Sequence, residues 1–173
     1  MGADLSPAAI RQARADADRL GIRNARFELG TEVEGRFDAA IAIFFLHHLP
    51  DAELAALPHK LRAQMPDGVF YSLDPSHRRL SGVVGRLLIP GLMKRYQTED
   101  ERELVPEETR ACFESAGWRA EVSMYDFGSS PLAGIFPGWA GGYRMARVVD
   151  NGILRVPGLA RRGSNFEIVA RIG

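Results

Sequence analysis

The chain has 173 residues, 46% of them hydrophobic, which is enough to bury one sizeable core and to form one domain. Its 22 basic residues balance its 22 acidic residues, and this zero net charge excludes a general nucleic-acid binder, which would carry a strong basic excess. One cysteine excludes an internal disulfide framework, and no apolar run approaches the roughly 20 residues that span a bilayer, so we expect a cytoplasmic protein without a signal peptide.

The first predicted helix covers residues 7–20. Ser6 is a favourable N-cap, and Pro7 suits the first helical position because the N–H that it lacks would have no helical partner there. Apolar residues then recur at helical spacing, at Ile10, Ala13, Ala17 and Leu20. Ahead of this helix only residues 2–4 remain to form a strand, which is shorter than a normal strand.

Strands and helices alternate after this helix. Residues 25–30 predict a short strand, and residues 37–45 (FDAAIAIFF) predict a strand that is apolar on both faces, as in the interior of a parallel sheet. A helix is expected over residues 49–65, with a bend where Pro58 removes a backbone hydrogen bond. Residues 68–74 predict another buried strand. The alternation indicates an α/β fold with a mainly parallel sheet.

This alternation stops at residues 76–105, which combine a basic, apolar stretch with an acidic run, TEDERE. Three further elements are predicted beyond it: a helix over residues 106–117, a strand over 121–127 and a closing strand over 165–172. The last two strands are separated by residues 128–163, a long insert rich in glycine and proline, with a helix expected near its middle.

The order of these motifs resembles that of the class I S-adenosylmethionine-dependent methyltransferases. The stretches that carry the resemblance are ADLSPAAIRQAR, FELGTE, FDAAIAIFFLHHLPD and MPDGVFYSLDP, followed by PEETRACFESAGW, YDF and NFEIVARI. The resemblance implies an incomplete Rossmann-like methyltransferase fold: an α/β fold with a mostly parallel sheet, an antiparallel last strand and helical lid inserts. Residues 1–173 would be a single domain, in which residues 1–75 are part of the cofactor-binding half and residues 76–105 and 128–163 are lid or acceptor inserts.

The resemblance implies S-adenosyl-L-methionine as the cofactor. In the family an acidic residue at the end of the second strand accepts hydrogen bonds from both ribose hydroxyls, and the matching residue here is Asp4, followed by Leu5 and Ser6. Asp4 could instead assist the helix N-terminus. In the family an acid contacts the adenine amino group, and its nearest counterparts here are Thr31 and Glu32. Glu32 could instead be an ordinary exposed acid of the loop.

In the family, the end of the strand that corresponds to residues 37–45 faces the methionine end of the cofactor and the acceptor. The resemblance therefore implies that Ile43 and Phe44 contact the cofactor. His47 and His48 are candidate general bases because imidazole titrates near neutrality, although one of them could simply cap or pack. Asp74 ends the next strand and is a candidate substrate contact, since ligands bind at the carboxyl ends of parallel strands. No pattern of cysteine and histidine indicates a metal site.

The family also has a first strand and a glycine-rich loop of the E/DxGxGxG type, and this sequence contains neither ahead of Asp4. We therefore interpret the chain as an N-terminally truncated member with impaired activity; a misplaced start, a split gene and genuine loss all stay open. Without a first strand, the 37–45 strand would have an unpaired edge. We expect that edge to pair with residues 25–30, to bind another chain and so promote self-association, or to leave the chain poorly stable.

Two functions remain open on this evidence. The first is methyl transfer to a small-molecule or lipid-like acceptor; the second is a non-catalytic remnant or partner subunit that acts through protein contacts. A nicotinamide dehydrogenase would also use an acid after its second strand, but FDAAIAIFFLHHLPD suits methyltransferases better. The basic stretch 77–95 and the insert 128–163 favour either an acidic or lipid-like acceptor with membrane-surface contact, or helices that cover the sheet with solvated arginines.

Overall fold

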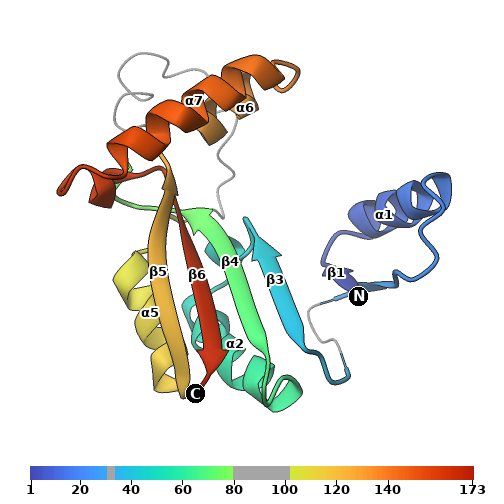
Figure 1. Cartoon of the computed structure of the whole chain (residues 1–173). Helices are drawn as coiled ribbons and strands as arrows, with labels where there is room; N and C mark the ends of the chain where they lie inside the picture. The colour runs from blue at the N-terminus through green and yellow to red at the C-terminus, as the bar shows by residue number, and fades with distance from the viewer. Residues whose placement is uncertain (31–33, 80–101) are drawn as a thin grey trace. The chain divides into compact units, whose positions relative to one another are not determined.

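The computed structural model describes residues 1–30, 34–79 and 102–173. These residues form two compact units, Met1–Arg36 and Phe37–Gly173, which we describe separately (Figure 1). The predicted adenine contacts, Thr31 and Glu32, lie outside the described residues, as do most of the predicted basic stretch and of the acidic run.

The N-terminal unit contains two short strands and one helix: β1 (Gly2–Asp4), α1 (Pro7–Arg19) and β2 (Phe27–Leu29). The strands are parallel and form their own two-stranded sheet. The helix begins as predicted, because Ser6 Oγ accepts a hydrogen bond from the backbone N–H of Ala9 at 3.2 Å. Ile10 and Ala17 are its buried apolar residues, as the helical spacing predicts.

The second unit is built on a four-stranded sheet in the order β3-β4-β6-β5. Its strands are β3 (Ala39–Ile43), β4 (Val69–Pro75), β5 (Trp118–Asp126) and β6 (Asn165–Ile172). Only β3 and β4 pair in parallel; β6 lies between β4 and β5 and runs antiparallel to both. The sheet is therefore mixed, and the prediction of a mostly parallel sheet is wrong. Buried apolar runs do not reveal strand direction, and the placement of one reversed strand in the interior makes two of the three pairings antiparallel.

Two helices, α2 (Asp51–Gln64) and α5 (Pro106–Ser115), cover one face of this sheet (Figure 1). Phe113 of α5 is fully buried and stacks on Phe70 of β4, with ring centroids 4.8 Å apart. Trp118 packs edge-on against Phe113, and its indole Nε1 donates a hydrogen bond of 3.0 Å to the carbonyl of Pro58 inside α2. These contacts join both helices to the strands in a single core.

The chain leaves α5 through Gly117, whose φ of +82° lies in the left-handed region that favours glycine. The preceding carbonyl, of Ala116, accepts a hydrogen bond of 2.6 Å from Arg62 Nη1 of α2. A Cβ atom at position 117 would collide with this guanidinium group. The backbone conformation therefore favours glycine here, and a larger residue would also have to displace the guanidinium group of Arg62.

The strand β3 lies at the edge of the sheet, beside β4 alone. Ala40 and Ala42 pack against the core, whereas the side chains of Ile41 and Ile43, on the opposite face, are 74% and 49% exposed. The prediction of a strand buried on both faces is wrong, because none of the described helices of this unit covers that side of β3. Of residues 25–30, which were expected to pair with this edge, Phe27–Leu29 form β2 and pair with β1 within the N-terminal unit.

Residues 128–163 form two helices, α6 (Ser129–Ile135) and α7 (Ala140–Ile153), followed by a short 3-10 turn. Two buried carboxylates fix the start of α6: Asp150 of α7 accepts the N–H of Ser129 at 2.9 Å, and Asp126 of β5 accepts the N–H of Ser130 at 2.7 Å. Asn165 of β6 donates to the other oxygen of Asp126 at 2.9 Å. This network holds the helix pair at the end of the sheet where β5 ends (Figure 1).

Candidate functional site

The parallel strands β3 and β4 have their carboxyl ends at the same end of the sheet. The candidate bases that were predicted from the sequence follow β3 there. The last ladder contact is a hydrogen bond of 2.8 Å from the N–H of Phe44 to the carbonyl of Leu73. Phe44 has a φ of 51°, a left-handed conformation that is uncommon for a residue other than glycine. This conformation turns the chain sharply into the 3-10 turn Leu46–His48.

The turn brings His47 against the fully buried carboxyl group of Asp74. Asp74 Oδ1 lies 3.0 Å from His47 Nδ1 and 3.3 Å from the backbone nitrogen of His47. When the imidazole is neutral, a carboxylate partner at Nδ1 keeps the proton there and leaves the lone pair on Nε2. The geometry thus fixes both the orientation of the ring and the nitrogen that remains available as a base.

Two further rings extend this site toward solvent. The ring of His48 lies 4.0 Å from that of His47, and His48 is exposed. Phe44 contacts His47 edge-on, with centroids 6.4 Å apart, and is itself 42% exposed. Together with the half-exposed Ile43, these rings provide an apolar surface at the end of β3.

Several buried polar atoms of this region have no hydrogen-bond partner in the described structure: Asp74 Oδ2, Ser72 Oγ, and Arg102 Nε and Nη2. Such atoms are rare in folded proteins, and two of the three residues that carry them, Asp74 and Arg102, contact His47. The backbone N–H of Arg102 donates to the carbonyl of His47 at 3.3 Å, and its guanidinium pairs with Asp51 at the start of α2. Sequence reasoning missed Arg102, because nothing in an acidic run distinguishes one arginine as a neighbour of this site.

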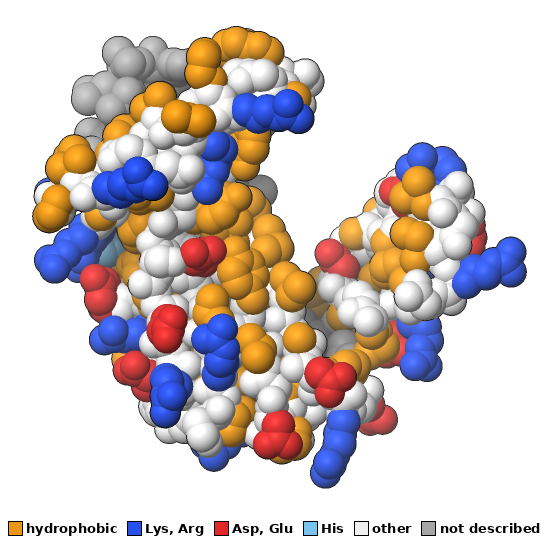
Figure 2. Space-filling model, viewed as in Figure 1, with side chains coloured by type: hydrophobic (Ala, Val, Ile, Leu, Met, Phe, Trp, Pro, Cys, Tyr) orange, Lys and Arg blue, Asp and Glu red, His pale blue; other side chains and the backbone are white. Residues whose placement is uncertain are grey.

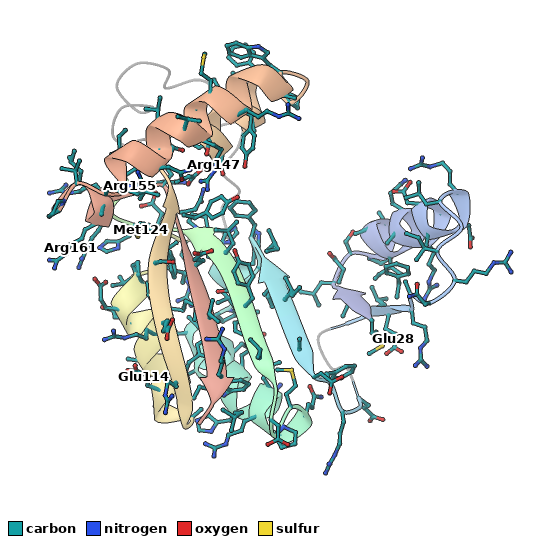
Figure 3. The ribbon with its side chains drawn as sticks, viewed as in Figure 1. Glu28, Glu114, Met124, Arg147, Arg155 and Arg161 are labelled. Carbon is teal, nitrogen blue, oxygen red and sulfur yellow. The ribbon has the colours of Figure 1, made fainter. Side chains whose placement is uncertain are left out.

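A second cluster that sequence reasoning missed lies where β5 ends, at the same edge of the sheet. Arg147 of α7 extends beneath the helix toward the strand ends, donates to the carbonyl of Tyr125 at 2.6 Å and covers its ring at 4.3 Å (Figure 3). A side-chain hydrogen bond with Tyr125 raises the pKa of Tyr143. The sequence contained a signal for this cluster: Tyr125 lies at the end of a predicted strand, as Asp74 does, so both were expected at the same end of the sheet.

In the N-terminal unit, Asp4 ends β1 and is exposed. Its Oδ1 accepts the backbone N–H of Ser6 at 2.7 Å, and its carbonyl accepts the N–H of Gly30 at 3.0 Å at the end of β2. Leu5 is 66% exposed. The structure thus contains the helix-supporting contact that was the alternative role of Asp4, and it leaves the carboxylate at the surface.

No protein-family model matches this sequence. Solved structures do: the chain has structural matches to many class I S-adenosylmethionine-dependent methyltransferases, over nearly its whole length and at low sequence identity. Its α/β structure therefore resembles the Rossmann-like fold of that class of enzymes.

Three of these structures illustrate the likeness. Magnesium protoporphyrin IX methyltransferase from Synechocystis, with bound SAH, is 12% identical, with a TM-score of 0.58 over 99% of this chain and 63% of that chain. S-adenosylmethionine-dependent methyltransferases from Archaeoglobus fulgidus and Clostridium acetobutylicum are 13% and 11% identical, with TM-scores of 0.56 and 0.63 over 98% and 99% of this chain. The chain spans 74% of each of these two proteins and less than two thirds of the first.

Proposed function

We propose that this chain takes part in methyl transfer from S-adenosyl-L-methionine to a small-molecule or lipid-like acceptor. The observation that carries the proposal is the pair of His47 and Asp74 at the carboxyl ends of parallel strands, in a fold that is shared with methyltransferases. Ligands of open α/β sheets bind at this edge. In this proposal α6 and α7, above the strand ends, form the side of the site that admits the acceptor.

His47 is the proposed base. An acceptor hydroxyl or amine gives its proton to Nε2 while its oxygen or nitrogen takes the methyl group, so no net charge builds up on the acceptor. Asp74 acts as a positioning residue, because its Oδ1 is already bound to Nδ1 and to the backbone of His47. His48 is exposed, with its ring tilted against that of His47, and in this proposal it lies on the solvent side from which an acceptor approaches.

Each unit has residues with the chemistry that one part of the proposed cofactor requires. In the N-terminal unit Asp4 has an exposed carboxylate suited to a ribose diol, with Leu5 and Ser6 beside it. In the second unit Ile43 and Phe44 have half-exposed apolar side chains suited to the methionine end. Thr31 and Glu32 keep their proposed adenine role. The cofactor supplies a methyl group on a sulfonium, which requires proximity and alignment from the protein and little further activation.

Isothermal titration of the chain with S-adenosyl-L-methionine tests the cofactor assignment. We expect saturable binding that Asp4→Asn weakens at least about tenfold, because a charged acceptor is lost, while Asp18→Asn, an exposed acid of α1, serves as the matched control. His47→Gln should leave binding unchanged, because His47 acts on the acceptor. A folded chain that gives no heat with the cofactor would contradict the proposal.

The second candidate function is a non-catalytic methyltransferase-fold subunit that acts through protein contacts. The open edge of β3, with Ile41 largely exposed, favours it, because an unpaired edge strand is a template for another chain. A chain that binds no cofactor but associates through β3 would support this candidate over the first.

A further inference from the structure

The helix α7 presents its apolar face outward and its polar face inward. Its inward residues include Arg147, which covers Tyr125, and Asp150, which is buried and caps α6. Met145, Val148 and Val149, on the opposite side, are 64%, 72% and 57% exposed. A helix on the surface of a globular protein normally buries such a stripe. Because the inward side chains are engaged, their contacts fix the helix in this inverted orientation.

The exposed apolar surface continues beyond both ends of the helix. Its members outside α7 are Phe136, Trp139, Val156 and Leu159, which are 53%, 53%, 45% and 43% exposed. Figure 2 shows hydrophobic side chains along the outer side of this helix, with Lys and Arg side chains beside them. We call these seven residues the α7 apolar surface.

The exposed charges of the segment that carries the α7 apolar surface, residues 136–162, have one sign. Arg144, Arg155, Arg161 and Arg162 are exposed on or after the helix, and the sequence from 136 to 162 contains one acid, Asp150, which is buried. Figure 3 shows Arg155 and Arg161 near the C-terminal end of α7, away from Arg147. An apolar strip whose own segment exposes arginines and no acid is complementary to a membrane interface, in which anionic headgroups lie above an apolar interior.

We propose that the α7 apolar surface binds the interface of a membrane that contains anionic lipids, with the helix lying parallel to the bilayer. Apolar residues enter the boundary between headgroups and acyl chains, arginines contact lipid phosphates, and Trp139 occupies the interfacial level. A second copy of the chain fits less well, because a two-fold contact would bring the same arginines together. None of the described helices is long and apolar enough to cross a membrane. This proposal is independent of catalysis.

Flotation with lipid vesicles tests the proposal directly. We expect the chain to float with vesicles of phosphatidylcholine that contain about one third phosphatidylglycerol, to float far less with phosphatidylcholine alone, and to be released by high salt. The emission of Trp139 should shift to the blue on binding, because Trp118, the other tryptophan, is already buried.

Two pairs of variants separate the apolar and the charged contributions. Val148→Ser with Val149→Ser should lower the partition coefficient at least about tenfold, whereas the matched pair Leu20→Ser with Ile22→Ser, also exposed but in the N-terminal unit, should not. Arg144→Glu with Arg155→Glu should have an effect of similar size, while Arg11→Glu with Arg23→Glu, which changes the net charge equally, should not. Circular dichroism verifies that each variant is folded.

Three results would overturn the proposal. The folded chain could fail to float with anionic vesicles at low salt; both members of a matched pair could bind equally; or sedimentation velocity could show self-association that Val148→Ser with Val149→Ser abolishes. The last result would assign the surface to a contact between copies of the chain.

Discussion

At the scale of single residues, the phenol of Tyr71 on β4 has a clearly raised pKa. It donates a hydrogen bond of 3.0 Å to Glu167 Oε2, and Ser123 donates one of 2.7 Å to the other oxygen. Burial, followed by the hydrogen bond with Glu167, raises the pKa of Tyr71 from 10.0 to about 12. Since the pKa is higher in the folded chain than in the unfolded chain, this group stabilises the fold fully below pH 10 and loses that contribution as the pH rises to about 12.

Replacing Tyr71 with Phe should lower the free energy of unfolding at neutral pH by about 1 kcal/mol, the net value of one hydrogen bond. The same variant should lose part of the alkaline destabilisation above pH 10, together with the tyrosinate absorbance that develops near pH 12. Denaturant unfolding and absorbance titration measure these effects. If the absorbance that disappears in Tyr71→Phe titrates at the ordinary value of 10.0, the interpretation is wrong.

At this scale the sequence named His47, His48 and Asp74 as candidates but not the contact between His47 and Asp74. Both could be placed at the same end of the sheet, because Asp74 ends the strand that comes after the 37–45 strand and ligands bind at the carboxyl ends of parallel strands. That Asp74 contacts His47 depends on the left-handed backbone of Phe44, and no pattern in the sequence signals that conformation. The position of Arg102 beside this turn could not be predicted either, because it follows from tertiary packing.

Among the elements, α6 depends on two carboxylates that lie outside it. Asp150 accepts the backbone N–H groups of Gly128 and Ser129. Burial alone would raise the pKa of Asp150, but the hydrogen bonds from Ser129, Gly128 and Phe127 outweigh it and lower that pKa below 3.8. The carboxylate therefore stabilises α6 above this pH, and the contribution is lost as the pH falls through the lowered pKa of the folded chain.

Asp150→Asn should destabilise the α6–α7 pair by about 1 to 3 kcal/mol, because the amide cannot accept the same set of N–H groups. Hydrogen exchange of α6 and denaturant unfolding measure the loss, with Asn151→Ala, at an exposed neighbouring position, as the control. The variant should also lose less stability than the original chain as the pH falls below 3.8. Equal exchange of α6 in both variants would show that Asp150 does not hold the helix.

Periodicity predicted the elements better than it predicted their surroundings. The expected helix in the 128–163 insert is present as α7, but its apolar stripe is exposed, whereas one of the two expectations was a helix that covers the sheet. Asp150 and Arg147 lie on the inward side instead, where they contact the start of α6 and Tyr125. The antiparallel direction of the last strand, β6, was expected from the resemblance and is confirmed, whereas its position between β4 and β5 was not predicted.

For the molecule as a whole, the unpaired edge of β3 is the feature that we expect to promote association between chains. Ile41 and Ile43 are exposed, and they lie beside Tyr71 and Leu73 on the face of the sheet opposite α2 and α5, where Figure 2 shows hydrophobic side chains gathered over the strands. An apolar edge strand promotes association between chains. We expect the chain to associate with increasing concentration.

Ile41→Lys should reduce this association, because a charged side chain on an edge strand opposes pairing with another chain. Sedimentation velocity over a range of concentrations measures the effect, and Ile22→Lys, at another exposed isoleucine, is the control. A chain that stays monomeric at high concentration and melts cooperatively at high temperature would contradict the expectation.

The close approach of Arg62 to Gly117 has a consequence for the evolution of this chain. A homologue with the same backbone at position 117 should keep glycine there, because the left-handed φ disfavours other residues and the guanidinium fills the adjacent space. A homologue with a larger residue at position 117 should therefore either differ at position 62 as well or direct its arginine away from the end of α5.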